Sequence, residues 1–410
     1  MELFKSTNYD FLGKKWPFII ASLVLTVAGL GSIFFWHGMN YGIDFKGGAT
    51  MTVRFAYPPP IDKIRSAMSH AIKGEVSVES FTSGTAPNSV SIGTELEEER
   101  LLNKNRQAME DVLVNTFGQP NSGKLDFNNT SEQSLVERLR PALAGAAVPM
   151  SDQQLQTLAT NLLAARDKDY SGLITDFHQL ASVPGMNPGI MNALQQVCYL
   201  PPFHVSEVQM VGPKVGAELR TKAVLATLYA LGGMLVYIAF RFEWIYGLGA
   251  VIACFHDTII TIGVFSLFNE QISMTVIAAL LTLVGYSMND TIVIFDRIRE
   301  NLKTSRREPL ESVMNRAVNQ TLSRTVMTSG LTFLTVIALF LFGGQVLHGF
   351  SFALVCGIIV GTYSSVFVAS PIVLFWHNYT DKRRKGPKSP VLATAPRTDG
   401  VRKGSTKAVK

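Results

Sequence analysis

Apolar residues along this 410-residue chain gather in long uncharged runs, each close to the length that crosses a membrane. A bilayer core about 30 Å thick requires about 20 apolar helical residues. The first run, Trp16–Trp36, has no small-residue cleavage site after it, so we interpret it as a retained anchor. The later runs are Ala223–Phe240, Trp244–Phe268, Ile272–Phe295, Thr325–Phe342 and one span within Val346–Trp376. The pattern predicts an α-helical membrane protein with six transmembrane helices, arranged one plus five. Because the last run is too long to cross straight, we expect its start near Gly349 to be interfacial or strongly tilted.

Between the first and second runs, the pattern changes to that of a small α+β domain. From Ala49 apolar and polar residues alternate, which is the period of a half-buried strand. Helical spacing returns over Ile61–Lys73 and Leu101–Phe117. Further strands are predicted at Val76–Phe81, Ser89–Ile92 and His204–Val211, with turn residues at Gly84 and Pro87-Asn88. The order strand-helix-strand-strand-helix-strand predicts a split βαβ, or ferredoxin-like, domain.

About eighty residues, Gln119–Leu200, interrupt this domain before its last strand. They are polar and rich in Asn, Gln and Ser. Their pattern predicts helices at Glu137–Leu143, Asp152–Arg166 and Ile190–Tyr199. A helical subdomain and a partner-binding arm are both open interpretations of this insertion.

The distribution of charge predicts which side of the membrane each part faces. The connection Arg297–Arg324 carries seven Lys and Arg residues, and the tail contains Lys382–Lys385, whereas the short loops at 269–271 and 343–345 carry none. Basic short loops remain in the cytoplasm. We therefore expect both termini to be cytoplasmic and the large domain extracytoplasmic. The expected parts are residues 1–15 (cytoplasmic), 16–37 (first span), 38–221 (outer domain), 222–376 (five-helix domain) and 377–410 (cytoplasmic tail).

Composition narrows the class of function. Only 17% of residues are charged, against about 25% in soluble proteins, and mean hydropathy is +0.21, which argues against a soluble enzyme. Of the net charge of +6, the tail from His377 contributes ten Lys or Arg and two Asp, which is +8, so the rest of the chain sums to −2. The basic tail therefore predicts binding to membrane lipids and not to nucleic acid.

The outer domain shows no pattern of catalytic or metal-binding residues. Its histidines, His70, His178 and His204, are scattered, and the acidic run Glu95–Glu99 is typical of a solvated face. Cys198, Cys254 and Cys356 are far apart and match no metal spacing, so no metal, cofactor or disulfide framework is predicted. A binding or mechanical domain is expected.

Two polar positions within the apolar runs draw attention. An ionised Asp within lipid costs about 2.5–3.5 kcal/mol, so Asp290 must face protein or water, be paired, or be protonated. Arg324 enters the next run at similar depth and aligns with Thr328 and Thr335 in a polar stripe. A direct or water-bridged pair of Asp290 and Arg324 would couple proton binding to movement, since an approaching Arg favours the ionised carboxylate. A static pair that locks two helices is the alternative.

The third run contains His256-Asp257 near mid-membrane. These residues are further candidates for a proton path, together with Ser287, Asn289 and Thr291, which lie close to Asp290 along the chain. A contact that only holds helices together explains His256-Asp257 equally well.

Five segments form a recognisable series along the chain: Tyr41–Gly48 (YGIDFKGG), Val211–Gly216 (VGPKVG), His256-Asp257, Leu281–Asn301 (LTLVGYSMNDTIVIFDRIREN) and Ser323–Thr325 (SRT). In this order they resemble the SecF family, the membrane subunit of the bacterial protein-translocation accessory complex SecDF. The resemblance implies a role in protein export driven by the proton gradient, within a twelve-helix unit like the resistance-nodulation-division pumps. It places proton conduction on Asp290 and Arg324. The long insertion departs from the family pattern.

The resemblance also implies partners and a localisation. SecD, the SecYEG channel, unfolded secretory polypeptide and, as a further candidate, YajC are the implied partners, and the bacterial cytoplasmic (inner) membrane is the implied location. No enzymatic activity is implied. Within Tyr41–Gly48, we expect Gly42, Asp44, Phe45, Gly47 and Gly48 to form the junction of membrane and outer domain, which transmits motion or is a rigid turn.

Three other hypotheses remain open from the residues. A proton antiporter half shares the pump ancestry, although drug pumps carry two outer domains in twelve spans. An intramembrane aspartyl protease would use Asp257 and Asp290 as a dyad that shares a proton. The third is a structural scaffold for the translocation channel.

Overall fold

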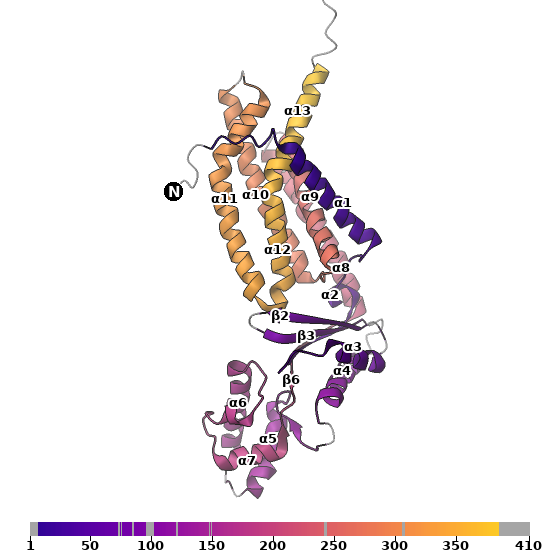
Figure 1. Cartoon of the computed structure of the whole chain (residues 1–410), viewed down its shortest axis with the longest axis vertical. Coiled ribbons are helices and arrows are strands. Elements are labelled where there is room, and N and C mark those ends of the chain that lie inside the picture. The colour runs from indigo at the N-terminus through magenta and orange to yellow at the C-terminus, as the bar shows by residue number, and fades with distance from the viewer. Residues whose placement is uncertain are drawn as a thin grey trace, which may run out of the picture.

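The computed structural model describes residues 7–384 except 73, 75, 84–85, 96–101, 120–121, 147, 149, 242–243 and 306–307 (Figure 1). Part of the expected acidic run and most of the basic tail therefore lie outside the described residues. Along the long axis of the molecule, a helical bundle is followed by a small sheet with its helices and then by a second helical group. The sheet thus lies between the bundle and the insertion.

The bundle contains the predicted spans. Its helices are α1 (Lys15–Phe35), α8 (Pro213–Arg241), α9 (Trp244–Phe268), α10 (Met274–Thr304), α11 (Leu310–Phe342) and α12 (Gly344–Ser364), which continues through a π-helical turn (Ser365–Ala369) into α13 (Ser370–Arg384). In the described part of the chain, six helical segments are long and apolar enough to cross a membrane. This confirms the expected number. The start of α1 and the end of α13 lie at the end of the bundle that is away from the sheet (Figure 1).

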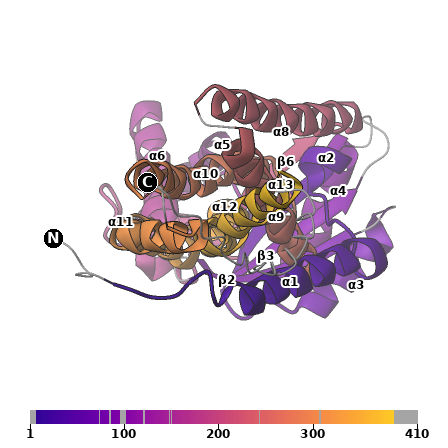
Figure 2. The ribbon, with the colours of Figure 1, turned by 90° about the horizontal axis from the view of Figure 1, so that it is seen from above.

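Seen from above, α1 and α8 lie on opposite flanks of a central group formed by α9, α10 and α12 (Figure 2). The central helices bury Met288, Phe295 and Ile298 of α10 against the neighbouring helices. The flanking helices leave large apolar side chains such as Leu23 and Tyr229 exposed. This is the surface expected of helices that face lipid or another membrane protein.

The sheet consists of β1 (Gly48–Phe55), β2 (Val76–Ser83), β3 (Ala86–Glu95) and β6 (Phe203–Val211), in the order β2-β3-β1-β6 with all neighbours antiparallel. Helices α3 (Ile61–Ala71) and α4 (Leu102–Phe117) cover one face, where Met51 and Val53 of β1 pack against Met68 and Leu113. A small sheet with covering helices is thus present between the first and second spans, as the sequence predicted. Thr50 and Thr52 of β1 lie on the other face, where they line a cavity together with Glu270 and His348 of the bundle.

Two local predictions are wrong. Pro87 and Asn88 belong to β3 and do not form the turn, because Asn88 accommodates a left-handed φ of 60° within the strand. The helix expected at Ile190–Tyr199 is α7 (Pro188–Val197), and Cys198-Tyr199 is a strand, β5, that pairs in parallel with β4 (Leu125–Asp126). The approach to Pro201 favours extended backbone at this point, since a residue before proline avoids the helical region.

The insertion is a helical subdomain with its own core. Its helices α5 (Glu132–Gly145), α6 (Asp152–Asp169) and α7, with a 3-10 turn at Phe177–Leu180, bury Leu135, Leu139, Leu158, Leu162 and Leu194 together. The fully buried Asn128 connects the insertion to the sheet domain. Its side-chain amide donates hydrogen bonds to the backbone carbonyls of Ile174 and Pro201, and its backbone carbonyl lies 2.6 Å from Nδ1 of His204.

Candidate functional site

Asp290 lies in the middle of α10 and is 4% exposed. Ser329 of α11 donates a hydrogen bond to Asp290 Oδ2 at 2.8 Å, and the amide of Asn289 lies 3.5 Å from Oδ1. The structure therefore holds this carboxyl between two membrane helices through a neutral hydroxyl. Such a site binds or releases a proton without breaking an ion pair.

Arg324 lies on the exposed surface of α11, five residues before Ser329. Among the described residues, no hydrogen bond or ion pair joins Arg324 to Asp290. Thr328 and Thr335 are exposed on the same helix, as the stripe predicted, and each hydroxyl donates to a backbone carbonyl one turn earlier. A cation in a membrane span that is exposed on this chain requires a covering partner or water.

In the part of the chain that the structure describes, two buried hydroxyls close to Asp290 along the helices have no hydrogen-bond partner. They are Tyr286 Oη, four residues before Asp290 on α10, and Thr325 Oγ1, four residues before Ser329 on α11. A buried polar group without a partner costs about 1–3 kcal/mol. The contact of α10 and α11 around Asp290 therefore leaves hydrogen-bonding capacity unused.

His256 and Asp257 lie on α9, and Asp257 is 1% exposed. The carboxylate accepts hydrogen bonds from His256 Nδ1 at 2.9 Å, from Ser287 of α10 and from Ser364 of α12 at 2.8 Å. Ser287 is thus a hydrogen-bond partner of Asp257 and not of Asp290. The other two candidates for the proton path are Thr291 and Asn289. Thr291 is buried, and its hydroxyl donates a hydrogen bond to the backbone carbonyl of Ser287, whereas Asn289 is exposed.

The junction motif connects α1 to the sheet and touches the start of α10. Gly42 donates its amide to the carbonyl of Ile272, and Asp44 Oδ2 accepts from the amide of Met274, the first residue of α10, at 2.8 Å. Phe45, in the short helix α2 (Ile43–Lys46), is buried among residues of the bundle. The helix that carries Asp290 is therefore held at its N-terminus by the segment that enters the sheet.

Glycine is required at the end of this motif. Gly47 has φ +81°, and a Cβ there would lie 2.6 Å from Cα of Pro213, the first residue of α8. A Cβ on Gly48 would lie 2.1 Å from the carbonyl oxygen of Thr94 in β3. Both contacts are shorter than any carbon side chain tolerates, so the two glycines allow β1 and α8 to meet at one point.

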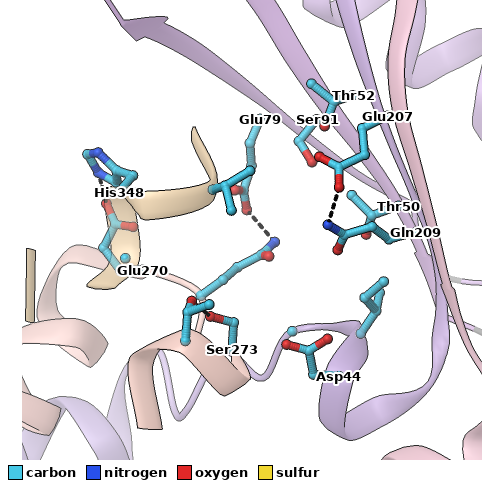
Figure 3. Close-up of a pocket in the computed structure, with 16 residues that line it drawn as sticks. Asp44, Thr50, Thr52, Glu79, Ser91, Glu207, Gln209, Glu270, Ser273 and His348 are labelled. Carbon is cyan, nitrogen blue, oxygen red and sulfur yellow. Dashed lines mark hydrogen bonds and ion pairs between the residues drawn. The ribbon is translucent and has the colours of Figure 1, made fainter. Parts of the chain in front are cut away.

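A cavity of about 180 Å³ lies between the polar face of the sheet and the adjoining end of the bundle (Figure 3). We call it the junction cavity. Its carboxylates come from both sides: Asp44, Glu79 and Glu207 from the outer domain and Glu270 from the turn between α9 and α10. His348 Nε2 of α12 lies 3.6 Å from Glu270, as the dashed line in Figure 3 shows.

One direct contact crosses this cavity. The side-chain amide of Gln271 donates to Glu79 Oε1 of β2 at 3.2 Å. Burial raises the pKa of Glu79, and the charge of Glu270 raises it further, against the opposing effect of the bond from Gln271. In the described residues, no group of three or more His, Cys, Asp or Glu side chains is arranged to hold a metal ion.

Sequence patterns missed the partners of the buried carboxylates. Ser329 and Ser364 carry no signal beyond being polar, and both stand in Ser-rich and Gly-rich spans where small residues usually allow close helix packing. An ionisable group near the membrane has to be partnered, which would have justified a search for such hydroxyls.

Known proteins resemble this chain over most of its length. Residues 193–379 match the family described as protein export membrane protein SecD/SecF, C-terminal, and residues 34–56 match the SecD/SecF GG motif. The chain is 47% identical over 395 residues to protein translocase subunit SecF of Koribacter versatilis, covering 93% of this chain and 95% of that protein. Protein translocase subunit SecF of Pseudomonas aeruginosa is 33% identical over 378 residues, covering 92% and 94%.

The fold also resembles a solved structure. The crystal structure of SecDF from Thermus thermophilus, described as a translocon-associated membrane protein, matches with a TM-score of 0.60 and 30% identity. The match covers 91% of this chain and 39% of the SecDF chain.

Proposed function

Because the chain belongs to the SecF family of protein translocase subunits, we propose that it pairs with SecD and uses the proton gradient to promote protein translocation across the bacterial cytoplasmic membrane. The observation that carries the proton step is the buried Asp290, held by Ser329 through a neutral hydroxyl. Asp290 takes up and releases the proton, and Arg324 favours its ionised form when the two approach.

An exposed polar stripe supports the pairing with SecD. Arg324, Thr328 and Thr335 of α11 lie exposed within a segment apolar enough to span the membrane. A partner that covers this stripe would enclose the proton path between the two subunits. It would also determine the position of the Arg324 side chain. The match covers only 39% of the SecDF chain of known structure. The remainder of that chain corresponds to such a partner.

The unpartnered hydroxyls support movement at this site. Tyr286 and Thr325 are buried close to the Asp290–Ser329 contact without hydrogen bonds. A second packing arrangement of α10 and α11 can give both hydroxyls hydrogen-bond partners. This gain favours a shift of the two helices when the charge of Asp290 changes. A proton that crosses 100 mV releases about 2.3 kcal/mol, enough to bias such a shift.

The junction motif carries the shift to the outer domain. Asp44 holds the amide of Met274 at the N-terminus of α10, and α10 is a continuous helix from there to Asp290. The outer domain lies on the extracytoplasmic side, where it contacts emerging polypeptide, and both termini are cytoplasmic. The SecYEG channel and, as a further candidate, YajC complete the assembly, and the basic tail binds anionic lipid.

The test is export of a secreted protein in cells depleted of their own copy of the subunit. We expect Asp290→Asn to accumulate uncleaved precursor, because the amide keeps the shape but binds no proton and forfeits up to about 2.3 kcal/mol per proton at 100 mV. Asp296→Asn, at an exposed position on the same helix, is the matched control and should export normally.

Normal export by Asp290→Asn at matched membrane levels would remove the proton step and favour the scaffold hypothesis. The protease hypothesis gains no support from the geometry, because no hydrogen bond joins Asp257 to Asp290 among the described residues.

A further inference from the structure

A chain of hydrogen bonds runs through the described helices to Asp257. Tyr363 Oη of α12 donates to Ser22 Oγ of α1 at 3.2 Å. Ser22 Oγ in turn contacts His256 Nε2, and His256 Nδ1 contacts Asp257 Oδ1 at 2.9 Å. The four residues come from three helices, and Ser22 lies 234 residues from His256 in the sequence.

The polarity of this chain is consistent from one end to the other. With Nδ1–H donating to the carboxylate, Nε2 carries no proton and accepts from the Ser22 hydroxyl, whose oxygen accepts from Tyr363. The two inner members, Ser22 and His256, therefore each accept one bond and donate one, which is the arrangement that passes a proton along a chain of hydrogen bonds. Ser22 and Asp257 are buried, whereas His256 and Tyr363 are partly exposed, so the chain leads from the surface of this subunit inward.

The inner end of the chain lies one helical turn from Asp290. Ser287 donates to the second oxygen of Asp257 and precedes Asp290 by three residues on α10. Residues at this spacing have Cβ atoms about 5–6 Å apart. Ser287 therefore links Asp257 to the part of α10 that carries Asp290.

Few other titratable groups surround Asp257. From the helices packed against it, the described ones are His256 and Cys254 on α9, Asp290 on α10 and Tyr363 on α12, while α1 contributes the neutral Ser22. In the described part of the chain, no Lys or Arg forms an ion pair with Asp257. Its carboxylate is therefore surrounded by hydroxyls and the imidazole.

We propose that Asp257 is a second proton-accepting site and that Tyr363, Ser22 and His256 form the relay that delivers the proton to it. This inference rests on the proton-driven function proposed above and adds to it a path held within this one subunit. In that path, a proton passes between the carboxyl groups of Asp257 and Asp290 by way of Ser287.

In this transfer, one proton enters the chain at Tyr363 and one proton becomes bound at Asp257. A hydronium at the exposed end gives a proton to Tyr363, whose hydroxyl proton passes to Ser22. The Ser22 proton binds Nε2 of His256, and the Nδ1 proton moves to Asp257 Oδ1. The hydroxyls are restored, the imidazole is left as the Nε2–H tautomer, and Asp257 is neutral. Release of the proton toward Asp290 and return of the imidazole proton reset the chain.

The experiment measures proton passage through the complex with SecD in vesicles that contain a pH-sensitive dye, driven by an imposed membrane potential. Wild type is compared with Asp290→Asn, Asp257→Asn and Ser22→Ala. We expect Ser22→Ala to slow proton passage about tenfold, since a missing donor interrupts the relay, and Ser22→Thr, which keeps the hydroxyl, to restore it.

Ser32→Ala is the matched control. Ser32 is buried on the same helix and joins the same two helices through a hydrogen bond to Ser266 at 2.8 Å, but touches no titratable group through that bond. It should conduct protons as wild type does. A control that slows passage as much as Ser22→Ala would show that the contact of α1 with α9 matters only for packing, and would overturn the relay.

The outcomes separate the two proposals. If Asp290→Asn blocks proton passage while Ser22→Ala and Asp257→Asn conduct normally, the relay is wrong and the proton-driven function stands. If Asp257→Asn alone fails and Ser22→Ala behaves as Ser32→Ala does, Asp257 is a structural hub and the relay is again wrong. If wild type passes no protons, both proposals fall. An infrared carboxylic-acid band that disappears in Asp257→Asn would support the second site directly.

Discussion

Gly29 and Gly263 bring α1 and α9 into direct backbone contact. A Cβ on Gly29 would lie 2.8 Å from Cα of Gly263, and a Cβ on Gly263 would lie 2.7 Å from Cα of Gly29. One contact between hydroxyl or imidazole groups lies on each side of this point, Ser22 with His256 and Ser32 with Ser266. The two glycines therefore set the spacing that both polar contacts need.

Gly29→Leu should lower the stability of the subunit by about 1–3 kcal/mol, because overpacking at a backbone contact forces the helices apart. Thermal unfolding in detergent measures this loss. Gly31→Leu is the control, since a Cβ at Gly31 meets no heavy atom within 4 Å. Equal effects of the two substitutions would contradict the close contact as the cause.

Between elements, the contact of β2 with the turn that joins α9 to α10 depends on pH. Glu79 of β2 has a raised pKa when the contact is closed, because burial and the charge of Glu270 oppose its ionisation. When the contact opens, the carboxyl is solvated and its pKa returns toward its usual range. The closed state thus binds the proton more tightly and is favoured at acid pH.

We expect the closed contact to persist at acid pH and to weaken as the pH rises through the raised pKa of Glu79. Hydrogen exchange of β2 and of the residues around Gln271, corrected for intrinsic rates, follows this change. Glu79→Gln should remove the pH dependence, since the amide does not titrate. A pH dependence that survives in Glu79→Gln would show that Glu79 is not the group responsible.

The whole molecule contains separate cores for the bundle, the sheet domain and the insertion. The chain enters and leaves the insertion through paired strands, with Leu125 opposite Cys198 and Asp126 opposite Tyr199. Neighbouring strands lie about 4.8 Å apart, so the ends of the insertion are adjacent. The sheet domain therefore does not need the insertion to close its fold.

Replacement of residues 125–199 by a short glycine linker should leave the bundle and the sheet folded and inserted in the membrane. Membrane levels and hydrogen exchange of β1 and β3 measure this, and removal of α3 and β2, which belong to the core of the sheet domain, is the comparison that should abolish folding. Degradation of the excised subunit would show that Asn128 and the contacts it makes are needed to hold the sheet.

The sequence alone determined the membrane plan of this protein. Each span satisfies its backbone hydrogen bonds internally, so length and hydrophobicity of a single segment suffice to predict it. The cost of a charge in lipid singled out Asp290 for the same reason, since that cost does not depend on knowing the neighbour. The alternation of β1 and the spacing of α3 and α4 are equally local, which is why the order of the outer domain was predicted while the ends of β3 and α7 were not.

Only the tertiary structure decided which side chains meet. Asp290 contacts Ser329 and not Arg324, Ser287 turns to Asp257, and Ser22 reaches His256 across 234 residues. Such contacts depend on the rotation and crossing angle of packed helices, which ridges and grooves on both partners set together. No periodicity within one segment contains that information, because it arises only when the two surfaces pack against each other.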